Sequence, residues 1–127
     1  MKKLLIVDDH PNIRRMIRYA LHDRFVVEES DSADTAYQML MKAPPDGIVL
    51  DVMMPGVMNG FQLCERIKRD SSLADIHVVL VSACGQVADQ ELGRSLGANA
   101  YFVKPFSPLA LAHHLIGALM QPSDRSA

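Results

Sequence analysis

The sequence predicts an α/β protein in which five parallel strands alternate with five helices. Two observations support this fold class. Short apolar runs alternate along the chain with segments whose apolar residues recur at helical spacing. In addition, the 127 residues, 49% of them hydrophobic, suit one domain with a single core.

The first half of the chain contains three such strands. Residues 4–7 are continuously apolar, as expected for a strand buried on both faces, and Pro11 is well suited to open the following helix. Residues 25–27 begin a second strand, and Ser32 is a suitable N-cap for the helix after it. Residues 48–50 form the third apolar run.

The second half repeats the pattern after a loop at residues 54–60, which is rich in turn-forming residues. A helix follows this loop, and Gly97 is expected as the C′ residue of a later one. The remaining elements are strands at residues 78–81 and 100–103 and helices at 87–96 and 109–120. Residues 1–120 are expected to form one domain, and the polar residues 121–127 a flexible tail.

Composition argues against several classes of function. The formal net charge of −2 provides no basic field for nucleic acid or an anionic membrane. The apolar run after Met1-Lys2-Lys3 is too short for a signal peptide, and no segment approaches the ~20 apolar residues of a membrane span. Cys64 and Cys84 are interpreted as reduced thiols, so a cytoplasmic location is expected.

Polar residues stand at the carboxyl ends of four expected strands, where an open α/β sheet binds its ligands. They are Asp8 and Asp9 after the first strand, Asp51 after the third, Ser82 after the fourth and Lys104 after the fifth. Each alone has an ordinary explanation as a turn or solvated residue. Their joint placement indicates one functional crevice.

The three carboxylates would repel one another unless a cation lay among them. Oxygen ligands favour Mg²⁺, whereas the Cys/His spacing typical of zinc sites is absent. An aspartate beside Mg²⁺ can act as a nucleophile toward phosphorus, with Lys104 and Ser82 binding the phosphoryl oxygens. The sequence therefore predicts an aspartyl-phosphate site.

Four segments resemble the receiver domain of bacterial two-component response regulators. They are residues 4–10 (LLIVDDH), 48–56 (IVLDVMMPG), 79–83 (VLVSA) and 97–106 (GANAYFVKPF). This resemblance implies a flavodoxin-like, CheY-like (βα)5 fold with strand order 2-1-3-4-5. It also implies a signalling protein that is not an enzyme in the ordinary sense, although it catalyses its own phosphorylation and dephosphorylation.

The resemblance also implies the roles of individual residues. Asp51 looks like the phosphoacceptor, Ser82 and Lys104 like phosphoryl ligands, Tyr101 like a switch residue, and Lys104-Pro105 like a cis peptide. Asp8, Asp9, Asp51 and the backbone carbonyl of Met53 would hold Mg²⁺. The implied partners are a histidine kinase or phosphotransfer protein and an effector or fused output domain, with a homodimer allowed after phosphorylation.

One departure and two alternatives stay open at this point. The loop after Pro55 is one residue longer than the family pattern. A haloacid-dehalogenase-like phosphatase would carry a second aspartate where Met53 stands. A receiver fold that only binds partners would have lost Asp51 or Lys104, and both are present. His10, His113 and His114 are interpreted as solvated residues.

Overall fold

The computed structural model describes residues 1–120, and the predicted tail at residues 121–127 lies outside this part. Five parallel strands form one sheet in the order β2-β1-β3-β4-β5, which confirms the predicted fold class. The strands are β1 (Lys3–Val7), β2 (Val26–Ser30), β3 (Gly47–Asp51), β4 (His77–Ser82) and β5 (Ala100–Val103). The helices are α1 (Pro11–Leu21), α2 (Ala33–Lys42), α3 (Gly60–Arg69), α4 (Val87–Ser95) and α5 (Pro108–Leu119).

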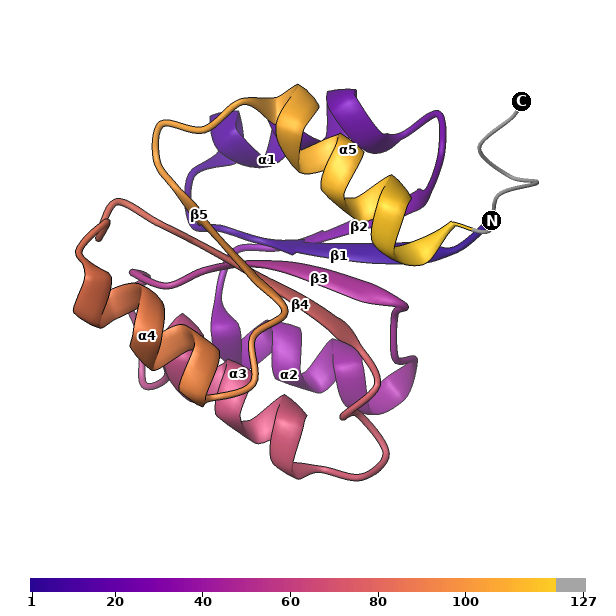
Figure 1. Ribbon diagram of the computed structural model, residues 1–127. Coiled ribbons are helices and arrows are strands. Elements are labelled where there is room, and N and C mark those ends of the chain that lie inside the picture. The colour runs from indigo at the N-terminus through magenta and orange to yellow at the C-terminus, as the bar shows by residue number, and fades with distance from the viewer. Residues whose placement is uncertain (121–127) are drawn as a thin grey trace.

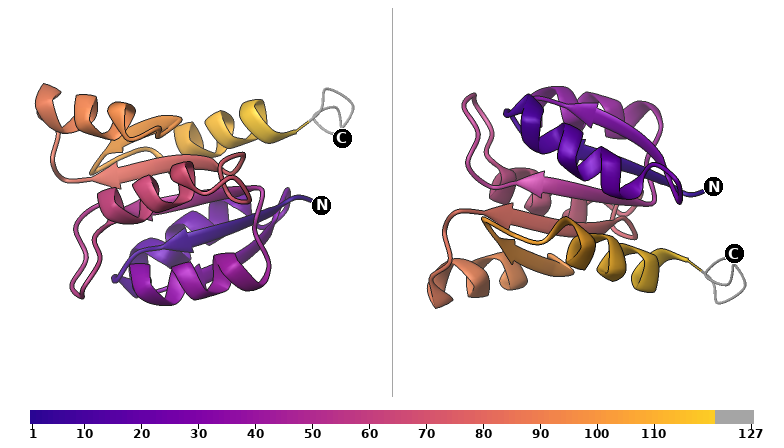
Figure 2. Two further views of the ribbon diagram at one scale, coloured as in Figure 1. Left: turned by 90° about the horizontal axis from the view of Figure 1, so that it is seen from below. Right: turned by 90° about the horizontal axis from the view of Figure 1, so that it is seen from above.

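The sheet lies between two helical layers (Figure 1). Helices α1 and α5 cover one face, and α2, α3 and α4 cover the other; Figure 2 shows the same arrangement from below and above. Strand β1 supplies both cores, because Leu5 and Val7 pack on the α2–α3 side while Leu4 and Ile6 pack toward α1 and α5. Burial on both faces explains why this strand is continuously apolar.

The predicted helix ends are largely confirmed. Pro11 opens α1, and the Ser32 hydroxyl accepts a hydrogen bond from the Thr35 amide at the start of α2. Gly97 follows α4 with a φ of 96°. Asn59 and Gln62 form a capping box that begins α3, which the sequence analysis did not anticipate.

The close packing of α3 against the end of β3 depends on Gly60. A Cβ atom at this position would lie 2.7 Å from the Cα of Val52, and the Gly60 amide donates to the carbonyl of Val52 at 3.0 Å. Only a residue without a side chain therefore allows the helix to begin so close to the backbone that follows Asp51.

Candidate functional site

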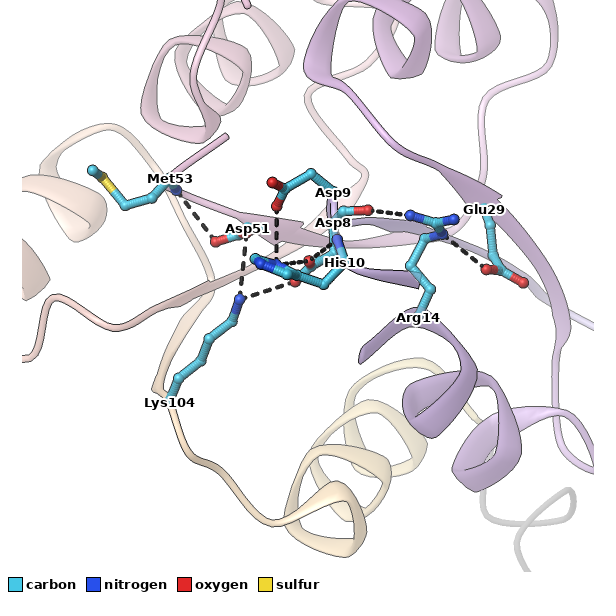
Figure 3. Close-up of polar contacts among 8 residues, drawn as sticks. All are labelled: Asp8, Asp9, His10, Arg14, Glu29, Asp51, Met53 and Lys104. Carbon is cyan, nitrogen blue, oxygen red and sulfur yellow. Dashed lines mark hydrogen bonds and ion pairs between the residues drawn. The ribbon is translucent and has the colours of Figure 1, made fainter. Parts of the chain in front are cut away.

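The carboxyl ends of β1, β3, β4 and β5 bring Asp8, Asp51, Ser82 and Lys104 to one edge of the sheet, as predicted. Asp8, Asp51 and Ser82 are almost fully buried, with 2%, 3% and 0% of their surfaces exposed. Lys104 and the two aspartates point toward one another in Figure 3. The site is therefore a small polar group of side chains enclosed by apolar strands.

Lys104 is the cation nearest the two buried carboxylates. Its Nζ lies 3.0 Å from Oδ2 of Asp8 and 3.4 Å from Oδ2 of Asp51. Burial opposes protonation of Lys104, but the hydrogen bond from its ammonium to Asp8 and the charge of Asp51 outweigh it, so the pKa is raised. The ammonium is consequently charged at neutral pH. The Lys104-Pro105 peptide bond is cis, as the resemblance implied.

The surroundings of Asp51 disfavour the ionisation of its carboxyl group. Burial and the neighbouring charge of Asp8 raise its pKa above the ordinary value, while Lys104 and a hydrogen bond from the Met53 amide act in the opposite direction. This amide donates to Oδ1 of Asp51 at 3.2 Å. The Met53 side chain extends away from Asp51 in Figure 3 and is 62% exposed.

Asp8 is held in place by neighbours that the sequence analysis missed. Nη1 of Arg14 donates to its backbone carbonyl at 2.6 Å, and Nε of Arg14 donates to Oε1 of Glu29 at 3.0 Å. Burial acts against ionisation of Glu29, but hydrogen bonds from Arg18 and Arg14 outweigh it and lower its pKa. The sequence did contain a signal for this contact with Glu29. Arg14 and Arg18 are four residues apart, which places both side chains on one side of α1.

Asp9 and His10 complete an acidic cluster with Asp8 and Asp51. One ligand atom from each of these four residues lies within 4.8 Å of the others. Oδ1 of Asp9 is hidden from solvent and accepts no hydrogen bond within residues 1–120, although 29% of the Asp9 side-chain surface is exposed and Nδ1 of His10 lies 3.1 Å from this oxygen. A buried anionic oxygen without a donor is unfavourable unless a cation approaches it, and oxygen ligands suit a hard divalent ion. The residues present therefore fit a metal ion.

His10 does not behave as a purely solvated residue. Its side chain is 63% exposed, yet Nδ1 lies 3.2 Å from Oδ1 of Asp8 and 3.1 Å from Oδ1 of Asp9 (Figure 3). His114 also differs from expectation: its Nε2 lies 2.9 Å from Nε2 of His77, and the ring is half-buried. His113 is exposed, as expected.

Ser82 and Tyr101 both contact the backbone of Cys84. The Ser82 hydroxyl oxygen accepts a hydrogen bond from the Cys84 amide at 3.0 Å, and the Tyr101 hydroxyl donates to the Cys84 carbonyl at 2.7 Å. Tyr101 also packs beside Gly93 of α4, where an added Cβ would lie 3.1 Å from its ring. One residue of the β4–α4 loop thus connects the site to the α4–β5 surface.

The loop after Asp51 is exposed at Pro55, Gly56 and Val57. Val57 is 93% exposed, whereas Met58 is buried in the core with α3. Gly56 has a φ of 121°, a conformation that other residues rarely adopt. The chain therefore exposes Gly56 and Val57 and returns to the core at Met58.

A family model described as the response regulator receiver domain matches residues 4–116, most of the chain. The chain belongs to this family. The match lies within the predicted domain of residues 1–120, and the haloacid-dehalogenase-like alternative is not supported. Within residues 1–120, none of the helices has both the length and the apolar character that crossing a bilayer requires.

Named relatives agree with this assignment. The chain is 38% identical over 128 residues to "Probable transcriptional regulator ycf27" of Guillardia theta, covering 99% of this chain and 48% of that protein. It is 36% identical over 129 residues to "Phosphate regulon transcriptional regulatory protein PhoB" of Pseudomonas aeruginosa, covering 99% and 56%. The receiver domain thus spans about half the length of these curated relatives.

Solved structures show the same fold. The chemotaxis response regulator CheY4 of Vibrio cholerae is 32% identical, with a TM-score of 0.85 and coverage of 94% of this chain and 99% of that one. A beryllofluoride-activated DrrB receiver domain is 26% identical, with a TM-score of 0.87 and coverage of 95% and 99%. The receiver family has a general phosphoacceptor role in two-component signalling, and its members interact with histidine kinases and effector domains.

Proposed function

We propose that this receiver domain accepts a phosphoryl group from a histidine kinase or phosphotransfer protein onto Asp51. The observation that carries the proposal is the convergence of Asp51, Asp8 and Lys104 at one buried edge, with Lys104 Nζ 3.4 Å from Oδ2 of Asp51. Family membership supplies the donor class, and the geometry supplies a nucleophile and a cation beside it.

In the proposed reaction an Asp51 oxygen forms a bond to phosphorus as the P–N bond of the donor phosphohistidine breaks. The electron pair of that bond leaves with the imidazole nitrogen. Lys104 moves from Asp8 and Asp51 toward an oxygen of the transferred group, and the Ser82 hydroxyl donates to another. Lys104 already contacts both carboxylates at this edge of the sheet, and Ser82 ends β4 opposite Val103 of β5.

Mg²⁺ is the proposed cofactor, held by Asp8, Asp9, Asp51 and the backbone carbonyl of Met53. When bound, it would neutralise the negative charge that develops on the phosphoryl oxygens. The protein residues orient the acceptor independently of the ion, because the Met53 amide fixes Oδ1 of Asp51 and Arg14 fixes the backbone of Asp8. The receiver would thereby catalyse its own phosphorylation.

The phosphorylated state is proposed to be read at the face formed by α4, β5 and α5. Apolar side chains are exposed there, including Leu92 (44%), Val103 (37%) and Leu109 (64%). Tyr101 connects this face to the site through Cys84. The proposed reader is an effector or a fused output domain, and a phosphorylation-dependent homodimer is the alternative use of this face.

The experiment that tests the acceptor assignment is phosphorylation by acetyl phosphate with Mg²⁺, followed by mapping of the modified residue by mass spectrometry. Modification at Asp51 alone is expected, with none in Asp51→Asn. A phosphoryl group that appears at the same rate in Asp51→Asn would overturn the proposal. Size-exclusion chromatography with and without beryllofluoride tests whether activation produces a homodimer. A protein that stays monomeric would favour an effector or output domain as the reader.

A further inference from the structure

The backbone of Asp8 is held by two neighbours that lie outside the acidic cluster. Its amide donates to the carbonyl of Ser30, at the end of β2, with an N–O distance of 3.1 Å. Its carbonyl accepts a hydrogen bond from Nη1 of Arg14, on α1, at 2.6 Å (Figure 3). Strand β2 and helix α1 therefore fix the peptide groups on both sides of the Asp8 Cα atom.

The guanidinium of Arg14 makes a second contact, which fixes its own position. Its Nε donates to Oε1 of Glu29, on β2, at 3.0 Å (Figure 3). Because the guanidinium is planar and rigid, anchoring Nε also determines the direction in which Nη1 points. The Arg14 side chain is only 17% exposed, so water competes weakly for either contact. Glu29 thus directs Arg14 toward the Asp8 carbonyl.

Arg18 provides a comparison within the same helix. Its Nε lies 2.5 Å from Oε2 of Glu29, the other oxygen of the same carboxylate. Its side chain is 42% exposed, and within residues 1–120 it makes no hydrogen bond to Asp8. Both arginines therefore join α1 to β2, but only Arg14 extends that connection to the site.

The backbone contact with Arg14 does not depend on the position of Lys104. The Asp8 carboxylate is also held through its oxygens, by the His10 amide at 2.8 Å and by Nζ of Lys104 at 3.0 Å. The proposed reaction moves Lys104 to a phosphoryl oxygen, which removes one of these contacts. The hydrogen bond from Arg14 to the Asp8 carbonyl remains available throughout.

We propose that Arg14 is a positioning residue, which holds the main chain of Asp8 so that its carboxylate keeps the place required for Mg²⁺ binding. The inference rests on the proposed function, which assigns Asp8 to the Mg²⁺ site. Loss of an outer contact that orients a metal ligand typically lowers metal affinity about ten- to a hundredfold. Lysine is a poor substitute for Arg14, because its single ammonium nitrogen lacks the fork that reaches two oxygens.

Positioning and charge predict effects of opposite sign. Arg14 carries a positive charge near the proposed cation site, so its loss would strengthen Mg²⁺ binding if only electrostatic repulsion mattered. If Arg14 positions Asp8, its loss weakens Mg²⁺ binding despite the removed charge. The direction of the change therefore distinguishes the two roles.

The test measures the Mg²⁺ affinity of the complete chain by isothermal titration calorimetry. Arg14→Met and the charge-conserving Arg14→Lys are compared with Arg18→Met and Arg18→Lys, which change the other ion pair of Glu29. We expect both Arg14 variants to bind Mg²⁺ about tenfold more weakly than the parent. The Arg18 variants should differ from the parent by less than about twofold, because a partly exposed ion pair contributes little.

Two further readouts separate positioning from a general loss of stability. Without metal, the Asp8 amide should exchange with solvent about tenfold faster in Arg14→Met, while the amide of Leu5 in the middle of β1 keeps the parental rate. A purely structural role would accelerate the exchange of both amides equally. With acetyl phosphate, Arg14→Lys should require about tenfold more Mg²⁺ for half-maximal phosphorylation but approach the parental rate at saturating Mg²⁺.

Unchanged or tighter Mg²⁺ binding in Arg14→Lys would overturn the inference. Equal weakening in Arg18→Lys would also overturn it, because the ion pairs of Glu29 would then act only on the fold. Failure of the proposed function would instead appear in the parent, as undetectable Mg²⁺ binding or as phosphorylation of a residue other than Asp51. Circular dichroism verifies the fold of each variant, and Arg14→Lys carries the comparison if Arg14→Met does not fold.

Discussion

Nζ of Lys104 lies 3.4 Å from Oδ2 of Asp51, farther than the 3.0 Å that separates it from Oδ2 of Asp8. One lysine is therefore shared between two buried carboxylates and is closer to the one that is not the proposed acceptor. The unequal sharing leaves Asp51 with incompletely balanced charge. A carboxylate oxygen with incompletely balanced charge is suited to act as the nucleophile toward phosphorus. The same charge should affect the free energy of unfolding.

The first prediction is that Asp51→Asn stabilises the metal-free protein. Because burial and Asp8 raise the pKa of Asp51, the native state binds its proton more tightly than the unfolded state does. Ionisation at neutral pH therefore reduces the stability of the parent. We expect Asn to raise the free energy of unfolding by about 1–2 kcal/mol at pH 7.5, as when other unfavourable buried charges are removed.

The stabilisation by Asp51→Asn should depend on pH. The favourable contribution of a carboxyl with a raised pKa is complete below its ordinary value of 3.8 and is lost as the pH rises through the folded value. The difference between variant and parent should therefore disappear in acid. Urea denaturation measures it, with Asp23→Asn as an exposed control. A less stable Asp51→Asn at pH 7.5 contradicts the prediction.

Lys104→Met should destabilise the metal-free protein. The substitution leaves two nearly buried carboxylates without their shared cation, and we expect a loss of about 2–3 kcal/mol at pH 7.5, less than for a fully buried pair. Millimolar Mg²⁺ should restore part of the loss. Thermal and urea unfolding measure both effects, with the exposed Lys2→Met as control. Equal stability of Lys104→Met and the parent would count against this account.

The half-buried contact between His77 and His114 predicts acid sensitivity. Burial, the adjacent His114 and the charge of Lys68 lower the pKa of His77 from 6.5 to about 4. The unfolded state therefore binds a proton at a higher pH than the native state does. Stability is complete above pH 6.5 and declines as the pH falls toward 4, by about 1–2 kcal/mol once solvent screening is included.

His77→Phe tests that prediction, because it removes the titrating ring but keeps an aromatic side chain. The unfolding free energy of this variant should depend less on pH between 6.5 and 4 than that of the parent. His113→Phe changes an exposed histidine and should retain the slope of the parent. If His77→Phe and the parent have the same slope, the pair does not control acid stability.

Ser82 and Tyr101 should respond together to phosphorylation, because both hydrogen-bond to Cys84. Movement of the Ser82 hydroxyl toward a phosphoryl group would break its bond to the Cys84 amide and shift the carbonyl that holds Tyr101. Beryllofluoride should therefore change the NMR signals of the Tyr101 ring. We expect a much smaller change in Ser82→Ala. An equal change in the parent and in Ser82→Ala would show that Tyr101 responds independently of Ser82.

The phosphorylated form is predicted to be long-lived. Hydrolysis requires a water in line with the new bond, and the positions two residues beyond Asp51 and Ser82 carry Met53 and Cys84, which hold water weakly. The exposed Met53 points away from Asp51, so weak hydrogen bonding is the better-supported cause than a steric block. Met53→Asn with Cys84→Glu should accelerate dephosphorylation about ten- to a hundredfold.

The measurement is release of phosphate from the purified phosphoprotein. Val57→Asn serves as a control, because it introduces the same polar group into the exposed part of the adjacent loop. The control should lose phosphate at the rate of the parent. A double variant that is no faster than the parent would show that water orientation at these two positions does not limit the reaction.

The apolar runs predicted four of the five strands to within one residue at each end, and the edge strand β2 poorly. β3 and β4 each extend only one residue beyond the prediction at both ends, because their burial on both faces makes them visible as continuous runs. β2 lies at the edge and continues through Glu28 and Glu29 to Ser30. Its half-solvated surface accepts charged residues, so the apolar pattern at residues 25–27 showed only its beginning.

The order of motifs along the chain determined the fold class, the residues expected at the site and the family. It could do so because Asp8, Asp51, Ser82 and Lys104 each follow a strand, and parallel strands bring their carboxyl ends to one edge. Only the tertiary structure decided which side chains touch. Lys104 pairs more closely with Asp8 than with Asp51, Arg14 holds the Asp8 backbone, and His77 meets His114. These contacts join elements distant in sequence, and their distances depend on packing and side-chain conformation rather than on local pattern.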